Sequence, residues 1–136
     1  MKKKISLIFI LLSFVMLAVG CKKIATPNEE SKALFGTWHY KSNSGGFSGG
    51  GGSTKFNSDY WIEFNDKGIY KVYQGSKKKQ KSRYKIEMRE SITGKVKATI
   101  VYQGGSMINH TFEVVGNTLY LYDEVYDGYM YHFEKK

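Results

Sequence analysis

Residues 110–123 read HTFEVVGNTLYLYD, and this stretch decides the fold. On either side of Gly116-Asn117, apolar and polar residues alternate, so every second side chain falls on the same face of an extended chain. A Gly-Asn pair between two such runs indicates a hairpin, because the tight turn needs residues that tolerate a positive φ. The stretch therefore predicts two antiparallel strands, at 107–115 and 118–123, with one apolar face.

The same pattern recurs along most of the chain. Short runs rich in Tyr, Phe, Val and Ile are separated by turn residues such as Asn65-Asp66-Lys67-Gly68 and Thr93-Gly94. We expect eight strands, at residues 34–41, 58–65, 68–74, 81–89, 95–102, 107–115, 118–123 and 128–135. Hairpin-linked neighbours with one buried face predict an all-β, antiparallel up-and-down meander, and closure into a barrel removes the exposed edges. Only Glu29 to Leu34 shows any sign of a helical turn.

The alternation also assigns an inner face. On strands four to eight it contains Tyr84, Ile86 and Met88; Val96, Ala98, Ile100 and Tyr102; Ile108, His110, Phe112 and Val114; Leu119 and Leu121; and Tyr129, Tyr131 and Phe133. An eight-stranded barrel has room for these side chains or for one small ligand. From the inner face we predict the following ligand-binding residues: Tyr70, Tyr84, Ile86, Ile100, Phe112, Leu121 and Tyr131. The open alternative is that they only fill the barrel, while the outward Tyr73, Tyr120, Tyr122 and Tyr126 contact a protein partner.

The N-terminus has the composition of an export signal. Lys2, Lys3 and Lys4 precede an apolar run from residue 5 to 19, and small residues lead to Cys21, the only cysteine. This order is typical of a removable secretory segment. We therefore divide the chain into a signal peptide at 1–20, a polar tether at 21–31 and a barrel domain at 32–136.

Residues 17–21, Leu-Ala-Val-Gly-Cys, resemble the lipobox of bacterial lipoproteins. The resemblance implies that Cys21 becomes the first residue of the mature protein and carries acyl chains that hold it in a membrane. Each buried CH₂ contributes ~0.8 kcal/mol, so several chains anchor firmly. Because Lys22 is not the aspartate that retains enteric lipoproteins in the inner membrane, the analogy favours the outer membrane. The alternative is a plain secretory peptide with Cys21 as a free thiol.

Charge narrows the range of partners. The net charge is +9, and it is +6 once the three lysines of the signal are removed. Lys77, Lys78, Lys79 and Lys81 form a cluster that either meets an anionic lipid surface or is a solvated hairpin tip. A chain that is exported and tethered to a membrane rarely meets nucleic acid, so we expect no nucleic-acid partner.

No catalytic motif stands out. A single cysteine excludes an internal disulfide, and the chain contains no Gly-x-Ser-x-Gly elbow. We expect His110 to be a core histidine, and Asp123, Glu124 and Asp127 to form a solvated turn. We predict no enzyme activity, no cofactor and no metal site, and we interpret Ser42 to Thr54 as a flexible glycine-rich loop.

Residues 34–38, Leu-Phe-Gly-Thr-Trp, open the domain. Their Gly-x-Trp resembles the start of the lipocalin family, and the chain is most similar to the lipocalin-like lipoproteins of Bacteroidetes-type bacteria. Further motifs carry the resemblance: Ile62-Glu63-Phe64, Asp66-Lys67-Gly68, residues 116–121 and residues 129–133. It implies a lipocalin-like barrel closed at one end by Trp38, and a small hydrophobic ligand. Lipocalins stack an arginine of the last strand over that tryptophan, and residues 128–135 contain no arginine.

The expected function is therefore a membrane-anchored lipoprotein whose barrel binds a small hydrophobic or amphipathic molecule. The alternative is a protein-interaction or inhibitor module with a filled barrel.

Overall fold

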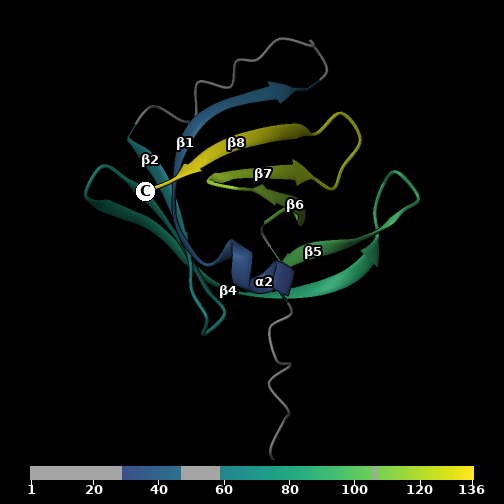
Figure 1. Cartoon of the computed structure of the whole chain (residues 1–136), viewed down its shortest axis with the longest axis horizontal. Helices are drawn as coiled ribbons and strands as arrows, with labels where there is room; N and C mark the ends of the chain where they lie inside the picture. The colour runs from purple at the N-terminus through teal and green to yellow at the C-terminus, as the bar shows by residue number, and fades with distance from the viewer. Residues whose placement is uncertain (1–28, 47–58, 106) are drawn as a thin grey trace, which may run out of the picture.

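The computed structural model describes residues 29–46, 59–105 and 107–136. The signal segment, Cys21 and most of the tether lie outside these ranges. Eight strands form one closed antiparallel barrel in chain order, which confirms the predicted up-and-down architecture (Figure 1). After the short helix α2 (Glu29–Leu34), the strands are β1 (Gly36–Gly45), β2 (Tyr60–Phe64), β3 (Ile69–Gln74), β4 (Lys77–Glu90), β5 (Val96–Tyr102), β6 (His110–Val115), β7 (Thr118–Asp123) and β8 (Tyr129–Lys135).

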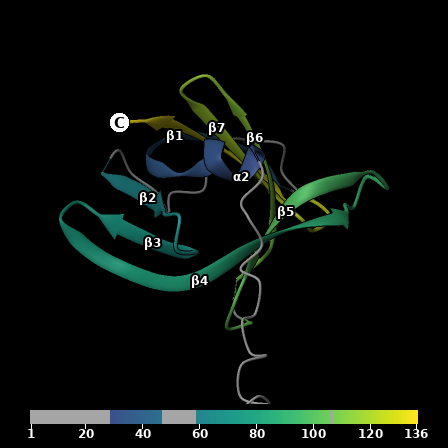
Figure 2. The same ribbon diagram turned by 60° about the horizontal axis from the view of Figure 1, so that its bottom comes forward.

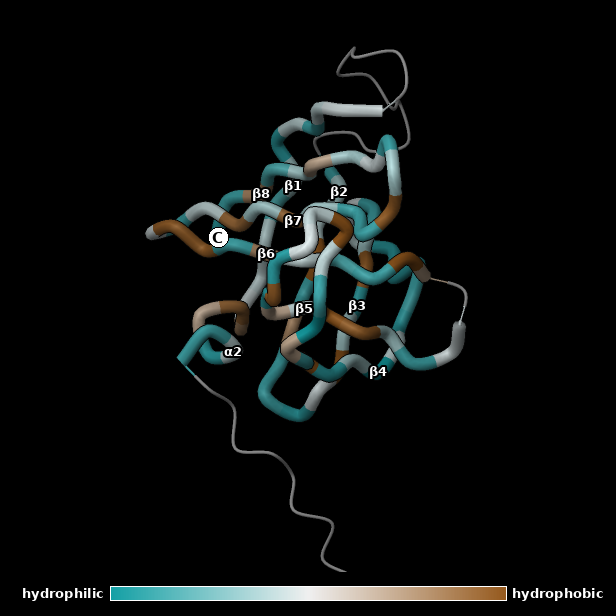
Figure 3. Tube along the Cα trace, turned by 90° about the vertical axis from the view of Figure 1, so that its right-hand side faces the viewer, coloured by the Kyte–Doolittle hydropathy of each residue, from teal (hydrophilic) through white to brown (hydrophobic). Residues whose placement is uncertain are grey.

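The barrel closes where β1 pairs with β8. The register runs from Trp38 opposite Lys135 to Gly45 opposite Tyr129, with an irregularity between Tyr40 and Ser42. The strand alternation on which the prediction rested is visible in Figure 3, where hydrophobic and hydrophilic residues follow one another along the strands.

Several predicted boundaries were wrong. Leu34 lies in α2 and not at the start of the first strand, and the first strand continues through Ser42–Gly45, which we had assigned to a loop. Residues 47–54 of that predicted loop lie outside the described residues. Strand β4 begins four residues early, at Lys77, and β6 begins late, at His110. As a result Ile108 is not an inner-face residue and is 47% exposed.

Trp38 is a core residue, as the inward face of the first strand predicted, and it lies opposite Lys135 at the end of β8. Its side chain is fully buried, and its indole N–H donates to the carbonyl of Leu34 at 2.8 Å. The ammonium group of Lys135, on the last strand, lies 5.1 Å from the centroid of the Trp38 ring, close enough for a cation–π interaction. Gly36 makes room for it: its φ is +135°, and an added Cβ would lie 2.9 Å from Lys135 Cε.

The core extends from Trp38 along the barrel axis. It is formed by Leu34, Trp38, Tyr40, Ile62, Phe64, Tyr70, Val72, Tyr84, Ile100, Tyr102, Leu119, Leu121 and Phe133. On the outer wall, three rings stand in a row across β1, β2 and β3, with centroid distances of 6.1 Å from His39 to Trp61 and 3.7 Å from Trp61 to Tyr73. In the described part of the chain, no helix is long and apolar enough to cross a membrane.

Candidate functional site

The barrel wall has a weak seam between β5 and β6. These strands pair at only two positions, Thr99 opposite Thr111 and Ile100 opposite His110. By contrast, β4 pairs with β5 from Tyr84 to Glu90, and β6 pairs with β7 along its whole length. Figure 2 shows the β4–β5 hairpin extending away from β2 and β3, with α2 drawn beside β6. The part of β5 before Thr99 and the part of β6 after Thr111 are therefore not paired with each other. Inner-face side chains on these parts lack a neighbour on the adjacent strand.

A groove of about 540 Å³ opens where these parts are unpaired, and we call it the seam groove. It is lined by α2 (Glu29, Glu30, Ala33), by the end of β4 (Met88), by β5 (Val96, Lys97, Ala98) and by β6 (Phe112, Glu113, Val114). Met88, Val96, Ala98, Phe112 and Val114 are inner-face residues by the strand alternation. Met88 is 59% exposed and Val96 is 65% exposed, so the prediction that the inner face is buried along its whole length was wrong here.

The groove combines an apolar floor with a charged rim. The floor comes from β4, β5 and β6, while the carboxylates belong to α2 and Glu113. Glu29 is paired with Lys32 at 2.7 Å, and the Lys97 ammonium lies 5.9 Å from the centroid of the Tyr122 ring. An apolar hollow with polar groups at its margin is the arrangement that binds small amphipathic molecules.

Most of the predicted ligand-binding residues lie deeper than this groove. Tyr70, Tyr84, Ile100 and Leu121 are buried in the core, and Ile86 and Tyr131 are half-buried against it. Only Phe112 lines the groove. The residues that the sequence prediction missed are Met88, Val96, Ala98, Val114 and Ala33. The alternation had placed the first four on the correct face, but it could not show that β5 and β6 separate beside them.

A polar network crosses the inside of the barrel next to the seam. His110 Nε2 lies 3.0 Å from Asp123 Oδ1, and the Tyr102 hydroxyl lies 3.0 Å from His110 Nδ1. The other carboxylate oxygen, Asp123 Oδ2, accepts hydrogen bonds from the Tyr129 amide at 3.0 Å and the Tyr131 hydroxyl at 3.4 Å. Asp123 is 8% exposed, so the prediction that it belongs to a solvated turn was wrong.

The network sets the protonation of its members. Burial alone would raise the pKa of Asp123, but the hydrogen bonds from His110 and the Tyr129 amide outweigh it and lower that pKa below its usual value. Burial raises the pKa of the Tyr102 and Tyr131 hydroxyls well above the usual value of 10. Both phenols are neutral at physiological pH, so the network positions side chains and offers no activated nucleophile.

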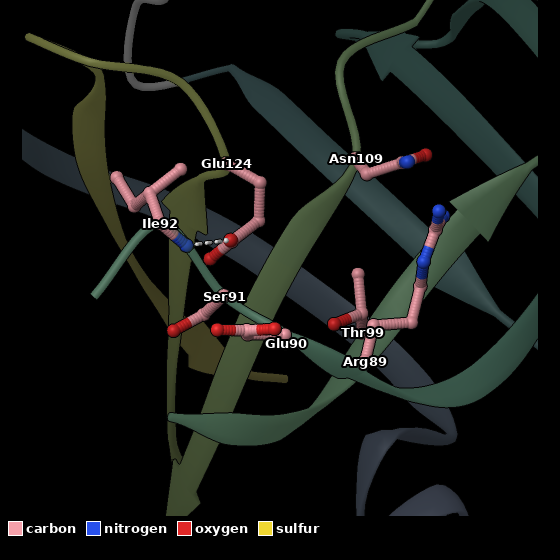
Figure 4. A pocket seen from close by; sticks show the side chains of 7 residues that line it. All are labelled: Arg89, Glu90, Ser91, Ile92, Thr99, Asn109 and Glu124. Atoms are coloured by element: carbon pink, nitrogen blue, oxygen red, sulfur yellow. Dashed lines mark hydrogen bonds between the residues drawn. The ribbon is translucent and has the colours of Figure 1, made fainter. Parts of the chain in front are cut away.

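A second hollow, of about 370 Å³, lies beside the turn that joins β4 to β5 (Figure 4). Glu124 uses both carboxylate oxygens there: Oε1 accepts from the Thr111 hydroxyl at 2.8 Å, and Oε2 accepts from the Ile92 amide at 3.0 Å. It therefore ties the tip of the β4–β5 hairpin to β6. The predicted solvated role of Glu124 misses this contact, because Ile92 is distant in sequence.

The remaining histidines lie on the outer wall. His39 is opposite Glu134, and His132 is opposite Ser42, so strand pairing keeps the two histidines several positions apart. Over residues 29–46, 59–105 and 107–136, no three His, Cys, Asp or Glu side chains gather closely enough to hold a metal ion. Comparison of the chain with protein-family models, curated proteins and solved structures finds no match.

Proposed function

We propose that the protein is an exported lipoprotein, held in the outer membrane by acyl chains on Cys21, whose barrel binds a small hydrophobic or amphipathic molecule. The seam groove carries this proposal. It is an open apolar hollow of about 540 Å³, the size range of small-molecule sites, and its floor consists of side chains that a fully closed barrel would bury. Binding rather than catalysis is proposed, because the polar groups nearest the seam are engaged with one another.

Occupancy of the groove is favoured by its exposed side chains. Met88 and Val96 together leave a large apolar area in water, and covering such area contributes about 25 cal/mol per Å². An apolar ligand seated between α2 and β6 would cover both. The resemblance carried by Gly36 and Trp38 implies binding of such a ligand inside the barrel. We propose the same kind of binding in the seam groove.

The test is native mass spectrometry of the full-length protein extracted gently from membranes, combined with titration of the neutral fluorescent probe Nile red. We expect a co-purifying small molecule and saturable probe binding. Ala98→Trp fills the groove and should weaken probe binding at least about tenfold, since ~1.4 kcal/mol of lost contact suffices. The matched control is Val101→Trp on the outer wall of the same strand. Equal probe binding by the two variants would contradict the proposal.

Anchoring needs a separate measurement. In cells expressing Cys21→Ser, we expect the protein to leave the membrane fraction and the acyl mass to disappear. A wild-type protein without acyl mass would remove the lipoprotein part of the proposal and leave the groove intact.

A second function is favoured by the well-filled barrel axis. Trp38, Ile62, Ile100 and Leu119 have no exposed surface, so the described interior is packed around them. The stacked row of His39, Trp61 and Tyr73 would then serve as a protein-contact surface on the outer wall. This alternative expects no co-purifying molecule and no effect of Ala98→Trp.

A further inference from the structure

The charge of this chain is concentrated in one hairpin. Residues 67–86, which span β3, its turn and most of β4, contain eight Lys or Arg and no Asp or Glu. The whole chain carries a net charge of +9, so this segment of twenty residues accounts for nearly all of it. The rest of the molecule is close to neutral, and the protein is strongly polarised.

The fold turns this segment into a continuous cationic face. Lys81, Arg83 and Lys85 occupy alternate positions of β4 on the outer wall, and all three are exposed. Alternate strand positions are about 7 Å apart, so the three cations form a row about 14 Å long. At one end of the row lie Lys77–Lys79, which are strand residues and equally exposed. On β3, Lys71 is directly opposite Lys81.

Few of these charges are neutralised within the protein. All twelve Asp and Glu lie in the described ranges, and only two of them pair with this segment: Glu63 with Lys71 at 2.8 Å, and Glu87 with Lys85. Six cations have no carboxylate within 4 Å in the described part of the chain, and we call them the hairpin face: Lys67, Lys77, Lys78, Lys79, Lys81 and Arg83.

Solubility alone does not account for this face. Lysines protect a strand edge from pairing with other chains, and residues 77–82 of β4 pair with β3 on one side only. Lys67 lies outside that edge, however, in the turn before β3. Unpaired like charges close together along one strand, such as Lys79, Lys81 and Arg83, also repel one another and oppose folding. A partner with closely spaced negative charges would offset this repulsion.

We propose that the hairpin face docks the barrel onto the anionic phospholipid surface of the membrane that holds Cys21. The proposal rests on the anchoring proposed above, which confines the domain near a bilayer. Seven residues lie between Cys21 and Glu29, so eight Cα–Cα steps give a reach of at most about 29 Å. In Figure 1, β4 and α2 both lie on the lower side of the barrel, so the anchor and the face can meet one surface. Docking would fix which side of the seam groove faces away from the membrane.

The test uses the mature chain from residue 21 onward carrying Cys21→Ser, which has neither the apolar export segment nor an acylation site. It is floated with vesicles of phosphatidylcholine alone and of phosphatidylcholine with 30% phosphatidylglycerol. The hairpin variant adds Lys79→Gln, Lys81→Gln and Arg83→Gln. The matched control instead adds Arg89→Gln, Lys95→Gln and Lys136→Gln, which removes the same charge from regions that are not in the hairpin face. Melting temperatures establish that all forms are folded, and a hairpin variant that fails to fold is replaced by Lys77→Gln, Lys78→Gln and Lys79→Gln.

Each cation near an anionic surface contributes about fivefold to partitioning, so we expect the hairpin variant to bind the anionic vesicles about 100-fold more weakly. The control should change by no more than about threefold, and salt should release the parent form. Equal losses in the two variants, or equal binding to neutral and anionic vesicles, would overturn the proposal. So would binding to soluble polyphosphate without binding to vesicles. Because no acyl chain or groove ligand takes part, this result is independent of the tests of the proposed function.

Discussion

At the scale of single residues, the packing where β1 begins beside the end of β8 depends on two side chains and a glycine. Trp38 is buried there, Lys135 covers its ring, and Gly36 leaves the space that Lys135 occupies. The indole N–H is satisfied by the Leu34 carbonyl, so the buried ring carries no unpaired polar group. Trp61 has a different environment, because it stacks on Tyr73 on the outer wall.

Trp38→Ala should therefore be far more destabilising than Trp61→Ala. Truncating a buried tryptophan typically costs ~3–5 kcal/mol, a large share of the total stability of a domain of this size. Denaturant midpoints of the two variants give the comparison. Equal and small losses would mean that Trp38 does not carry the packing described above.

The Asp123 carboxylate should make stability depend on pH. Its pKa is lowered in the folded protein, so its contribution is fully present above its unfolded pKa, near 3.8, and is lost as the pH falls through the folded value. Asp123→Asn should cost about 1–3 kcal/mol at pH 7, because His110 and Tyr129 lose a charged partner. Urea unfolding at pH 7 and at pH 3 should show that the difference in unfolding free energy between wild type and Asp123→Asn is smaller in acid. An equal difference at both pH values would contradict a lowered pKa for Asp123.

At the scale of elements, the seam is the part of the barrel with the least backbone pairing. Two positions join β5 to β6, and the side chain of Glu124 supplies a further tie to the tip of the β4–β5 hairpin. Segments with few such bonds open locally at a lower free energy than the rest of a structure. The hairpin tip has its own internal hydrogen bonds, such as Ser91 N–H to the Lys95 carbonyl, and Glu124 connects it to the rest of the barrel.

Glu124→Ala should loosen that tip without unfolding the barrel. The Ile92 amide loses its acceptor, so its hydrogen exchange should accelerate, while amides in the middle of β7 keep their protection. The expected loss of global stability is about 1 kcal/mol. Glu124→Gln retains one carbonyl acceptor, so its hydrogen-exchange rate at Ile92 should lie between those of the wild type and Glu124→Ala. Unchanged exchange at Ile92 in Glu124→Ala would show that the tip is fixed by other contacts.

Elements also show how far sequence patterns reach. The 110–123 stretch predicts β6 and β7 well, because their pairing is local and the turn residues fix its register. The seam could not be predicted in this way, since it depends on how β5 crosses β6 and on a contact between Ile92 and Glu124. Asp123 was misassigned for the same reason: its burial depends on His110 and Tyr131, which lie on neighbouring strands. Alternation identifies the face of a residue but not what covers it.

At the scale of the whole molecule, stability depends on the contact between the first and last strands. Removing residues 129–136 deletes β8 and leaves β1 and β7 each with one unpaired edge, because β1 keeps only β2 and β7 keeps only β6. We expect this truncated chain to lose cooperative unfolding and the near-ultraviolet circular dichroism of its packed aromatic rings. Removal of Lys136 alone, beyond the end of β8, is the matched control and should preserve both signals. A cooperative transition in the longer truncation would mean that the remaining strands close without β8.

The pairing of β1 with β8 also sets the moment at which the protein can fold during its synthesis. Trp38 meets Lys135, so β1 can pair with β2 early but has to wait for the synthesis of β8 before its second edge is covered. Contacts between residues so far apart in the chain make folding slow. A nascent chain that lacks β8 is a sheet with two uncovered edges, the form most prone to aggregate. Barrel closure is therefore a late event in the synthesis of this domain.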